Sequence, residues 1–139
     1  PMSDHPTQTP STHELASRAL AASTILAGLD TQLKNALLND LADAIDRDSH
    51  AVLDANRSDL RSATERGLSE AKTRRLTLSA SSISQLSAGI RQVAALPDPV
   101  GTCTQERVVP SGLKVRRVRV PLGVVCMIYE ARPGVTVDA

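Results

Sequence analysis

The tripeptide Pro97-Asp98-Pro99 divides the chain into two parts that carry different sequence patterns. Proline lacks a backbone N–H and restricts the residue before it, so a helix cannot continue through this tripeptide. Before it, apolar residues recur at the spacing of amphipathic helices, and after it valine and arginine alternate as in β-strands. The sequence therefore predicts a helical part followed by a β part.

Five helices are predicted before Pro97, from N-cap residues that alternate with stop signals along this part of the chain. The first begins at Ser11 or Thr12 and ends near Gly28, and the fifth covers about residues 79–96. The candidate N-caps of the other three are Asp30 or Thr31, Asp48 or Ser49, and Ser69, and Gly67 is expected to close the third helix. The second helix carries the clearest apolar stripe, which consists of Leu33, Leu37, Leu38, Leu41 and Ile45. With Tyr129 as the single aromatic residue, the core must be aliphatic, which favours packed helices.

A β-hairpin is predicted after Pro99. The segments 102–109 and 113–120 flank Pro110-Ser111-Gly112, a turn in which glycine is available for a positive φ. The apolar residues of the second segment change face along its length. We therefore expect a bulge or a sharp twist near Arg116-Arg117.

The run from Val124 to Ile128 is apolar at every position and does not alternate. Such a run predicts a strand covered on both faces, as in a parallel sheet, with Cys126 as a small buried hydrophobe. One strand cannot form a parallel sheet, so we expect its partners beyond Ala139 or in another chain.

The residues after this run form a candidate ligand site. Open α/β sheets bind ligands beyond the carboxyl ends of their strands, where a following helix offers N–H groups to anions. Arg132 adds a charge suited to phosphate or carboxylate, and Glu130 could orient it or bind a hydroxyl. On the residues alone, the favoured interpretation is a loop that these two side chains only cap and solvate.

Several other classes of function are disfavoured. The net charge is +1, and the basic run between Lys114 and Arg119 has no interleaved aromatic residues, so no nucleic-acid partner is expected. No apolar run approaches the roughly 20 residues that cross a bilayer. The three histidines are scattered, and the two cysteines show neither metal spacing nor a disulfide framework. We expect no metal, no membrane partner and a cytoplasmic location.

The motif VPLGVVCMIYEARPGVTVDA, residues 120–139, closely resembles the signature of the gamma-glutamyl phosphate reductase family, also called glutamate-5-semialdehyde dehydrogenase. Four upstream blocks resemble family sequence in family order, so the resemblance covers roughly residues 12–139. These blocks are LDANRSDL, KTRRLTL, GIRQVAALPDPVG and GLKVRRVRVPLGV. The family belongs to the aldehyde dehydrogenase superfamily.

The resemblance implies an α/β fold and an order of parts. The chain would supply the N-terminal helical part of an aldehyde-dehydrogenase-like cofactor-binding domain, a projecting β-hairpin and the first parallel strand. We expect a disordered tail at residues 1–10, the helical part at 11–101 and an oligomerisation hairpin at 102–121. Residues 122–139 would hold the first core strand and turn of an incomplete cofactor-binding domain. Because the corresponding segment of the superfamily belongs to its oligomerisation element, the resemblance implies a homo-oligomer.

The resemblance also implies a reaction. The family reduces L-glutamyl 5-phosphate with NADPH to L-glutamate 5-semialdehyde, releases phosphate and serves proline biosynthesis. A cysteine thiolate attacks the acyl phosphate, and hydride reduces the resulting thioester. The family places that cysteine beyond position 139, so neither Cys103 nor Cys126 would be the nucleophile. This chain alone is therefore expected to be inactive, as the N-terminal fragment of an NADP-dependent oxidoreductase.

Family resemblance assigns Glu130, Ala131, Arg132 and Pro133 to the cleft for cofactor and substrate. Gly134 departs from the pattern, since the family carries asparagine there and the superfamily uses that side chain to hold an oxyanion. Losing one such donor typically costs about 2.7–4 kcal/mol of barrier. A non-catalytic helical interaction module remains the alternative. Another aldehyde dehydrogenase specificity is disfavoured, because Glu-Ala-Arg-Pro replaces the usual Pro-Trp-Asn-Phe turn.

Overall fold

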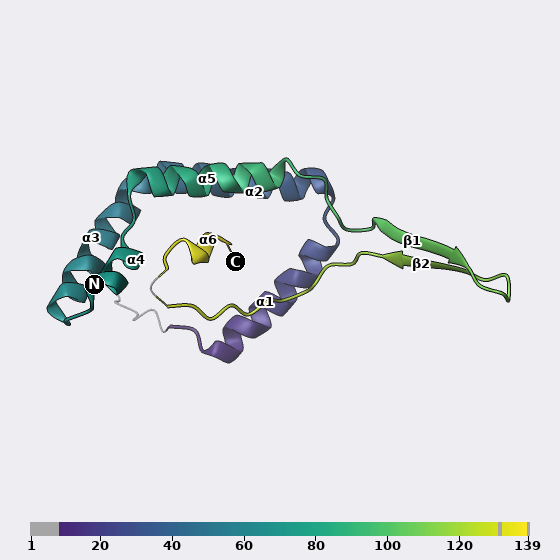
Figure 1. The fold of residues 1–139 in the computed structure, drawn as a ribbon, viewed down its shortest axis with the longest axis horizontal. Helices are drawn as coiled ribbons and strands as arrows, with labels where there is room; N and C mark the ends of the chain where they lie inside the picture. The colour runs from purple at the N-terminus through teal and green to yellow at the C-terminus, as the bar shows by residue number, and fades with distance from the viewer. Residues whose placement is uncertain (1–8, 131, 139) are drawn as a thin grey trace, which may run out of the picture. The chain divides into compact units, whose positions relative to one another are not determined.

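A computed structural model describes residues 9–130 and 132–138 of the chain (Figure 1). The disordered tail expected at residues 1–10 lies outside these residues except for its last two positions. In chain order the elements are α1 (Thr12–Ala27), α2 (Thr31–Arg47), α3 (Ser49–Glu65), α4 (Glu70–Leu76), α5 (Ala80–Ala94), β1 (Cys103–Val108), β2 (Lys114–Val118) and α6 (Val135–Asp138). They fall into two compact units, one of residues 1–29 and 99–125 and one of residues 30–98 and 126–139.

Helix α1, in the first unit, begins where the cap signal predicts. The Ser11 hydroxyl accepts a hydrogen bond from the Glu14 N–H at 3.2 Å, and the Ser11 N–H donates to the Glu14 carboxylate at 2.7 Å. This reciprocal pair is a capping box, and it lowers the pKa of Glu14 because the Ser11 N–H and hydroxyl stabilise the charged carboxylate. Leu15 and Leu26, two of the apolar residues of this helix, are exposed.

The hairpin of the first unit pairs β1 with β2 in antiparallel order, as predicted. Gly112 closes the turn with a φ of 84°. The pairing passes from Cys103 opposite Val118 to Gln105 opposite Arg117, so Thr104 is an extra residue in β1. The irregularity thus lies beside Arg117, near the predicted position, although the bulged strand is β1. All residues of both strands are exposed.

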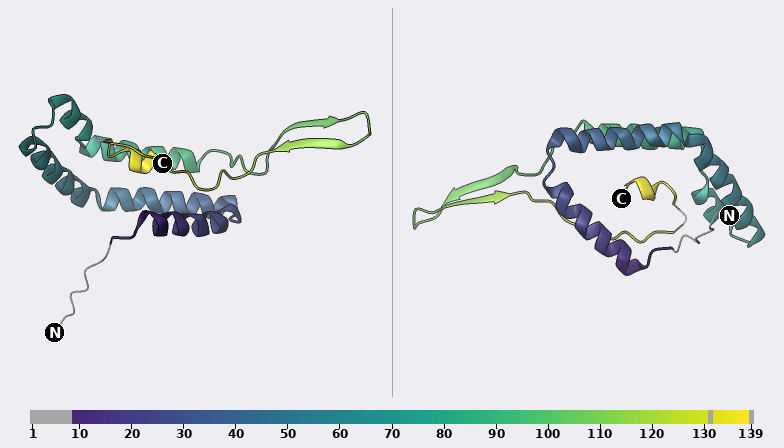
Figure 2. Two further views of the ribbon diagram at one scale, coloured as in Figure 1. Left: turned by 90° about the horizontal axis from the view of Figure 1, so that it is seen from below. Right: turned by 180° about the vertical axis from the view of Figure 1, so that it is seen from behind.

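The second unit is built on α2 and α5, which lie side by side and antiparallel (Figures 1 and 2). Their contact contains small and branched aliphatic side chains together with one hydroxyl. The buried residues are Ala42 on α2 and Ile83, Ser87, Ile90 and Ala94 on α5. The predicted stripe on α2 is only partly covered, because Leu38 and Ile45 are half-buried while Leu33, Leu37 and Leu41 remain exposed.

Helices α3 and α4 continue the second unit. Gly67 ends α3 with a φ of 70°, and the N–H of Leu68 donates to the Ala63 carbonyl at 3.0 Å. The N–H of Gly67 donates to the Thr64 carbonyl at 3.0 Å, which completes a Schellman motif. The chain therefore turns sharply into α4, as the glycine predicts.

The prediction of a strand covered on both faces at Val124–Ile128 is wrong for this chain. Residues 121–130 contain no strand in the structure, and Val124, Val125, Met127 and Ile128 are exposed. Cys126 is likewise exposed rather than buried. The physical reason is the absence of a partner, since among the described residues only β1 and β2 pair. An apolar run becomes a strand only where another backbone supplies its hydrogen bonds.

None of the helices in residues 9–130 and 132–138 is both long enough and apolar enough to cross a membrane.

Candidate functional site

An open hollow of about 310 Å³ lies in the second unit, between the junction of α4 with α5 and the turn before α6. Two segments far apart in the sequence therefore meet in one place. The hollow is lined by Arg75, Thr77, Leu78, Arg132, Pro133, Gly134, Val135 and Asp138. Two predicted site residues, Arg132 and Pro133, belong to this lining, and so does Gly134.

The junction of α4 with α5 is held by Asn56 of α3. The Asn56 amide nitrogen donates to the Leu76 carbonyl at 2.9 Å, and the Leu78 N–H donates to the Asn56 side-chain oxygen at 2.9 Å. Asn56 is 5% exposed, so these bonds satisfy a buried polar side chain. Both ends of the Leu76–Leu78 segment are thereby fixed to α3, with Thr77 between them at the edge of the hollow.

The turn before α6 is closed by its own backbone. The Val135 N–H donates to the Arg132 carbonyl at 3.0 Å, and the Val137 N–H donates to the Gly134 carbonyl at 3.0 Å. The hydroxyls of Tyr129 and Thr136 are hydrogen-bonded to each other. A Cβ placed on Gly134 would lie 3.5 Å from Cδ2 of Leu86, an ordinary van der Waals contact. The residues around Gly134 would therefore tolerate a Cβ at this position.

Guanidinium groups give the hollow its chemistry. For residues 9–130 and 132–138 the structure records no ion pair or side-chain hydrogen bond to the guanidinium of Arg75 or of Arg132. Arg74, next to Arg75, instead pairs with Glu70 at 2.8 Å along α4. Asp138 is the only carboxylate among the lining residues. The lining thus contains two guanidiniums without a recorded partner among the described residues and one carboxylate. This excess of positive charge suits the binding of a carboxylate or a phosphate.

Glu130 lies outside this lining. Its carboxylate is 4.0 Å from the ammonium of Lys72, and both side chains are mostly exposed. Such a surface pair contributes little to stability. Ala131, the remaining predicted site residue, lies outside the described residues.

Sequence reasoning missed Asn56, and it favoured a solvated helix end for Arg74-Arg75 while leaving a distant role in binding phosphate open. Asn56 and Ala63 lie one heptad apart and are both buried on α3. A polar residue on the covered face of a helix was the signal that could have found Asn56, because buried amides need partners. Arg75 left a weaker signal, since the doublet Arg74-Arg75 reads as a solvated helix end.

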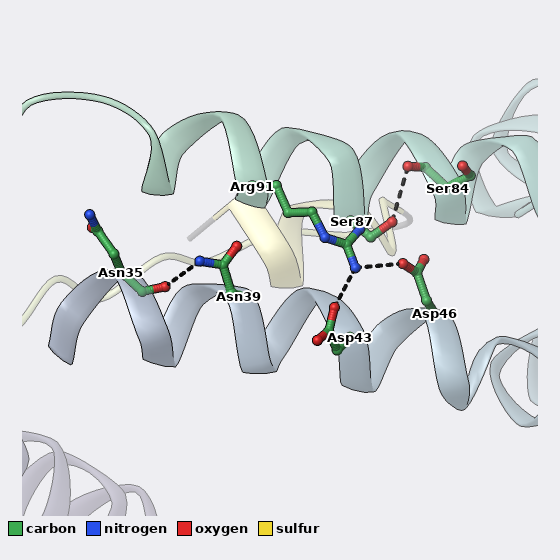
Figure 3. Close-up of polar contacts among 7 residues, drawn as sticks. All are labelled: Asn35, Asn39, Asp43, Asp46, Ser84, Ser87 and Arg91. Atoms are coloured by element: carbon green, nitrogen blue, oxygen red, sulfur yellow. Dashed lines mark hydrogen bonds and ion pairs between the residues drawn. The ribbon is translucent and has the colours of Figure 1, made fainter. Parts of the chain in front are cut away.

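A second polar cluster joins α2 to α5 and is structural (Figure 3). One guanidinium nitrogen of Arg91 donates to Asp43 at 2.5 Å and to Asp46 at 2.9 Å. Hydrogen bonds from Ser87 and Arg91 lower the pKa of Asp46, because they favour its charged form. These charges satisfy one another. In the described part of the chain no group of histidine, cysteine, aspartate and glutamate side chains could hold a metal ion.

The hairpin of the first unit carries a larger hollow, of about 480 Å³, lined by Gln105, Arg107, Val115, Arg116 and Arg117. Its side chains belong to a two-stranded ribbon with no further layer among the described residues. We regard it as the surface of a twisted ribbon rather than as a small-molecule site.

Together, the helical unit, the β-ribbon and the turn before α6 describe a mixed α/β chain in which two arginines line one hollow. Comparison with known sequences and structures makes the class specific. No family model matches the chain. It is 50% identical over 126 residues to the gamma-glutamyl phosphate reductase of Geobacillus thermodenitrificans, covering 91% of this chain and 30% of that protein. It is 51% identical over 122 residues to the reductase of Moorella thermoacetica, covering 88% of this chain and 29% of that protein.

Solved structures give the same result. The crystal structure of gamma-glutamyl phosphate reductase from Thermotoga maritima matches with a TM-score of 0.83 at 36% identity, over 91% of this chain and 30% of that one. The enzyme from Saccharomyces cerevisiae matches with a TM-score of 0.83 at 30% identity, over 94% of this chain and 33% of that one. The chain is therefore homologous to one part of gamma-glutamyl phosphate reductases, and it spans about 30% of the length of its curated relatives. The resemblance and the α/β fold class predicted from the sequence are confirmed.

Proposed function

We propose that the complete protein containing this chain reduces L-glutamyl 5-phosphate with NADPH to L-glutamate 5-semialdehyde and releases phosphate, a step of proline biosynthesis. The observation that carries the proposal is identity of 45–51% to curated reductases from several bacteria over about nine-tenths of the chain. Identity at this level, spread over helices, hairpin and turn together, supports a common reaction as well as a common fold. A biosynthetic reaction of this kind belongs in the cytoplasm.

Within that reaction we assign to this chain one wall of the cleft for cofactor and substrate. The proposed site is the Glu130–Pro133 segment, of which Arg132 and Pro133 line the hollow of the second unit. The cofactor supplies hydride when bound. The residues present fit only an edge of a dinucleotide site, because α6 has four residues and the sequence contains no G-x-G-x-x-G phosphate loop.

The nucleophile is proposed to come from outside this chain. A cysteine thiolate would displace phosphate from the acyl carbon and form a thioester, which accepts hydride more readily than a carboxylate does. Cys103 lies at the start of β1 and Cys126 in the irregular segment before the turn, and neither lines the hollow. The domain order proposed with this function is a tail at 1–10, a helical part at 11–101, a hairpin at 102–121 and, at 122–139, the segment that carries the turn.

Genetic complementation tests the proposed function. The full reading frame that contains these residues should restore growth without proline to a bacterium that lacks its own gamma-glutamyl phosphate reductase. A frame carrying cysteine-to-serine substitutions beyond this chain identifies the nucleophile, because one of them should abolish growth. Failure of the intact frame to restore growth, despite soluble expression, would count against the function.

A further inference from the structure

We propose that Arg75 acts together with Arg132 to bind one oxyanion, a carboxylate or a phosphate, of the small-molecule substrate. This inference rests on the proposed function and adds to it a residue and a ligand class. It begins from the hollow of the second unit, which is lined by one arginine from the end of α4 and another from the turn before α6. Two guanidiniums beside one cavity form a charge-assisted site for an oxyanion.

The contrast between neighbouring arginines supports a role for Arg75. Arg74 is engaged with Glu70 at 2.8 Å, one turn back on α4, and does not line the hollow. Arg75 lines the hollow and has no recorded ion pair in the described part of the chain. The doublet therefore divides into one arginine that stabilises the helix surface and one that is available for a ligand.

The backbone beside Arg75 is pre-organised. Asn56 bonds to Leu76 and Leu78 at 2.9 Å each, so the residues that directly follow Arg75 are anchored to α3. Anchoring lowers the conformational entropy that the site loses when a ligand binds. On the other side of the hollow, the hydrogen bond from the Val135 N–H to the Arg132 carbonyl closes the turn that carries Arg132.

Size and charge favour a small acid over a whole dinucleotide. A volume of about 310 Å³ stands at the lower end of the range for small-molecule sites, roughly 300–1,000 Å³. Two arginines and Asp138 leave one net positive charge in the lining. Glutamyl phosphate carries both an α-carboxylate and a phosphate, and the hollow offers the donors for one of them.

Kinetics in the reverse direction distinguish the two sources of the oxyanion. The complete protein is assayed with glutamate 5-semialdehyde, inorganic phosphate and NADP⁺, and the KM of each is measured for Arg75→Gln and Arg75→Lys. We expect Arg75→Gln to raise the KM of one anionic reactant by about 10- to 100-fold, as for a lost hydrogen bond to a charged group. A higher KM for inorganic phosphate would show that Arg75 binds the phosphate group. A higher KM for the semialdehyde would show that it binds the α-carboxylate. Arg75→Lys should fall between Arg75→Gln and the wild type.

Arg74→Gln is the matched control, since it removes the neighbouring guanidinium outside the hollow, and all its KM values should stay within about twofold of the wild type. Unchanged KM values for Arg75→Gln, or a rise confined to NADP⁺, would overturn the proposal. Arg75 is exposed, so its substitution should leave the far-UV circular dichroism unchanged.

Equilibrium binding separates this proposal from the reductase activity. Calorimetric titration of the complete protein with inorganic phosphate and with glutarate should detect binding of one of them, at least tenfold weaker in Arg75→Gln. If the protein binds one of these anions but has no reductase activity, the proposed oxyanion site stands and only the proposed function is refuted. Absence of binding by both anions in the wild type, or equal binding by Arg75→Gln, would contradict the site.

Discussion

Arg132 is the residue on which the proposed cleft depends most directly. Arg132 lines the hollow, and a bidentate pair between its guanidinium and a substrate oxyanion would need the planar fork that lysine lacks. Arg132→Lys in the complete protein should therefore lower kcat/KM roughly 10- to 100-fold in steady-state kinetics. This corresponds to a loss of about 1.5–3 kcal/mol of transition-state stabilisation. If the side chain only solvates the turn, neither kinetic constant will change, and the assignment of Glu130–Pro133 to the cleft must be withdrawn.

Gly134 allows a second test at the same turn. A Cβ at this position meets only the flexible end of Leu86, at 3.5 Å, so a side chain can start here without a clash at its first atom. We expect Gly134→Asn to leave the melting temperature within a few degrees of the wild type and to raise kcat. A preorganised oxyanion donor is worth about 10²–10³-fold when complete, and a grafted one should recover a fraction of that. A kcat that is unchanged or lower would show that another group already holds the oxyanion.

At the scale of the elements, Asn56 joins α3 to the end of α4 and to the linker before α5. Asn56→Ala removes both hydrogen bonds of the Leu76–Leu78 segment and leaves a partly buried N–H and carbonyl without these partners, which should lower the free energy of unfolding by about 1–3 kcal/mol. Because this segment follows Arg75, the KM of the anionic reactant should rise as well.

Asn39→Ala is the control for Asn56→Ala. Its amide donates to the Asn35 carbonyl at 2.8 Å within exposed helix surface, so urea unfolding should detect almost no change. Equal stability of the Asn56→Ala and Asn39→Ala proteins would show that the α4–α5 junction is held by other contacts.

The hairpin β1–β2 should form a subunit contact, because a two-stranded ribbon exposed on all sides is marginally stable by itself. In the complete protein, Val115→Asp should weaken a homo-oligomer, measured as a lower mass by sedimentation velocity. Val52→Asp on α3 is the matched control, since Val52 is 40% exposed and Val115 38%. A wild-type monomer, or an oligomer indifferent to Val115→Asp, would contradict the prediction.

Local signals predicted the elements well. The capping box at Ser11 and Glu14, the stop at Gly67 and the hairpin turn at Gly112 each depend on residues within a few positions, and the structure has all three. The Val124–Ile128 strand could not be realised, because its hydrogen bonds depend on backbone that is not adjacent in this chain. Local patterns specify a strand's faces but not its partner.

For the same reason, only part of the proposed site could be read from the sequence. Arg132 and Pro133 stand in a motif that can be read directly, whereas Arg75 joins them only through the folding of distant segments. The anchoring by Asn56 likewise links α3 to a segment beyond α4. Such contacts follow from tertiary packing and leave no fixed spacing in the sequence.

At the scale of the whole molecule, the chain spans about 30% of the length of the reductases it resembles. Several of its apolar side chains are exposed, as expected for one part of a larger fold. Helix α1 has no buried residue, and exposed leucines stand along α2. In a monomeric domain such surface is normally covered by further layers or by a partner. The 139 residues by themselves should therefore show no reductase activity, which makes them the negative control for the complete protein.

The most direct test of the central claim is the phosphate dependence of NADP⁺ reduction by the complete protein. With glutamate 5-semialdehyde as substrate, NADPH should form, measured at 340 nm, only when inorganic phosphate is present, because phosphate must release the acyl group from the enzyme as glutamyl phosphate. Formation of NADPH at the same rate without phosphate would instead indicate an aldehyde dehydrogenase that releases glutamate. That result, or no NADPH under either condition, would contradict the account.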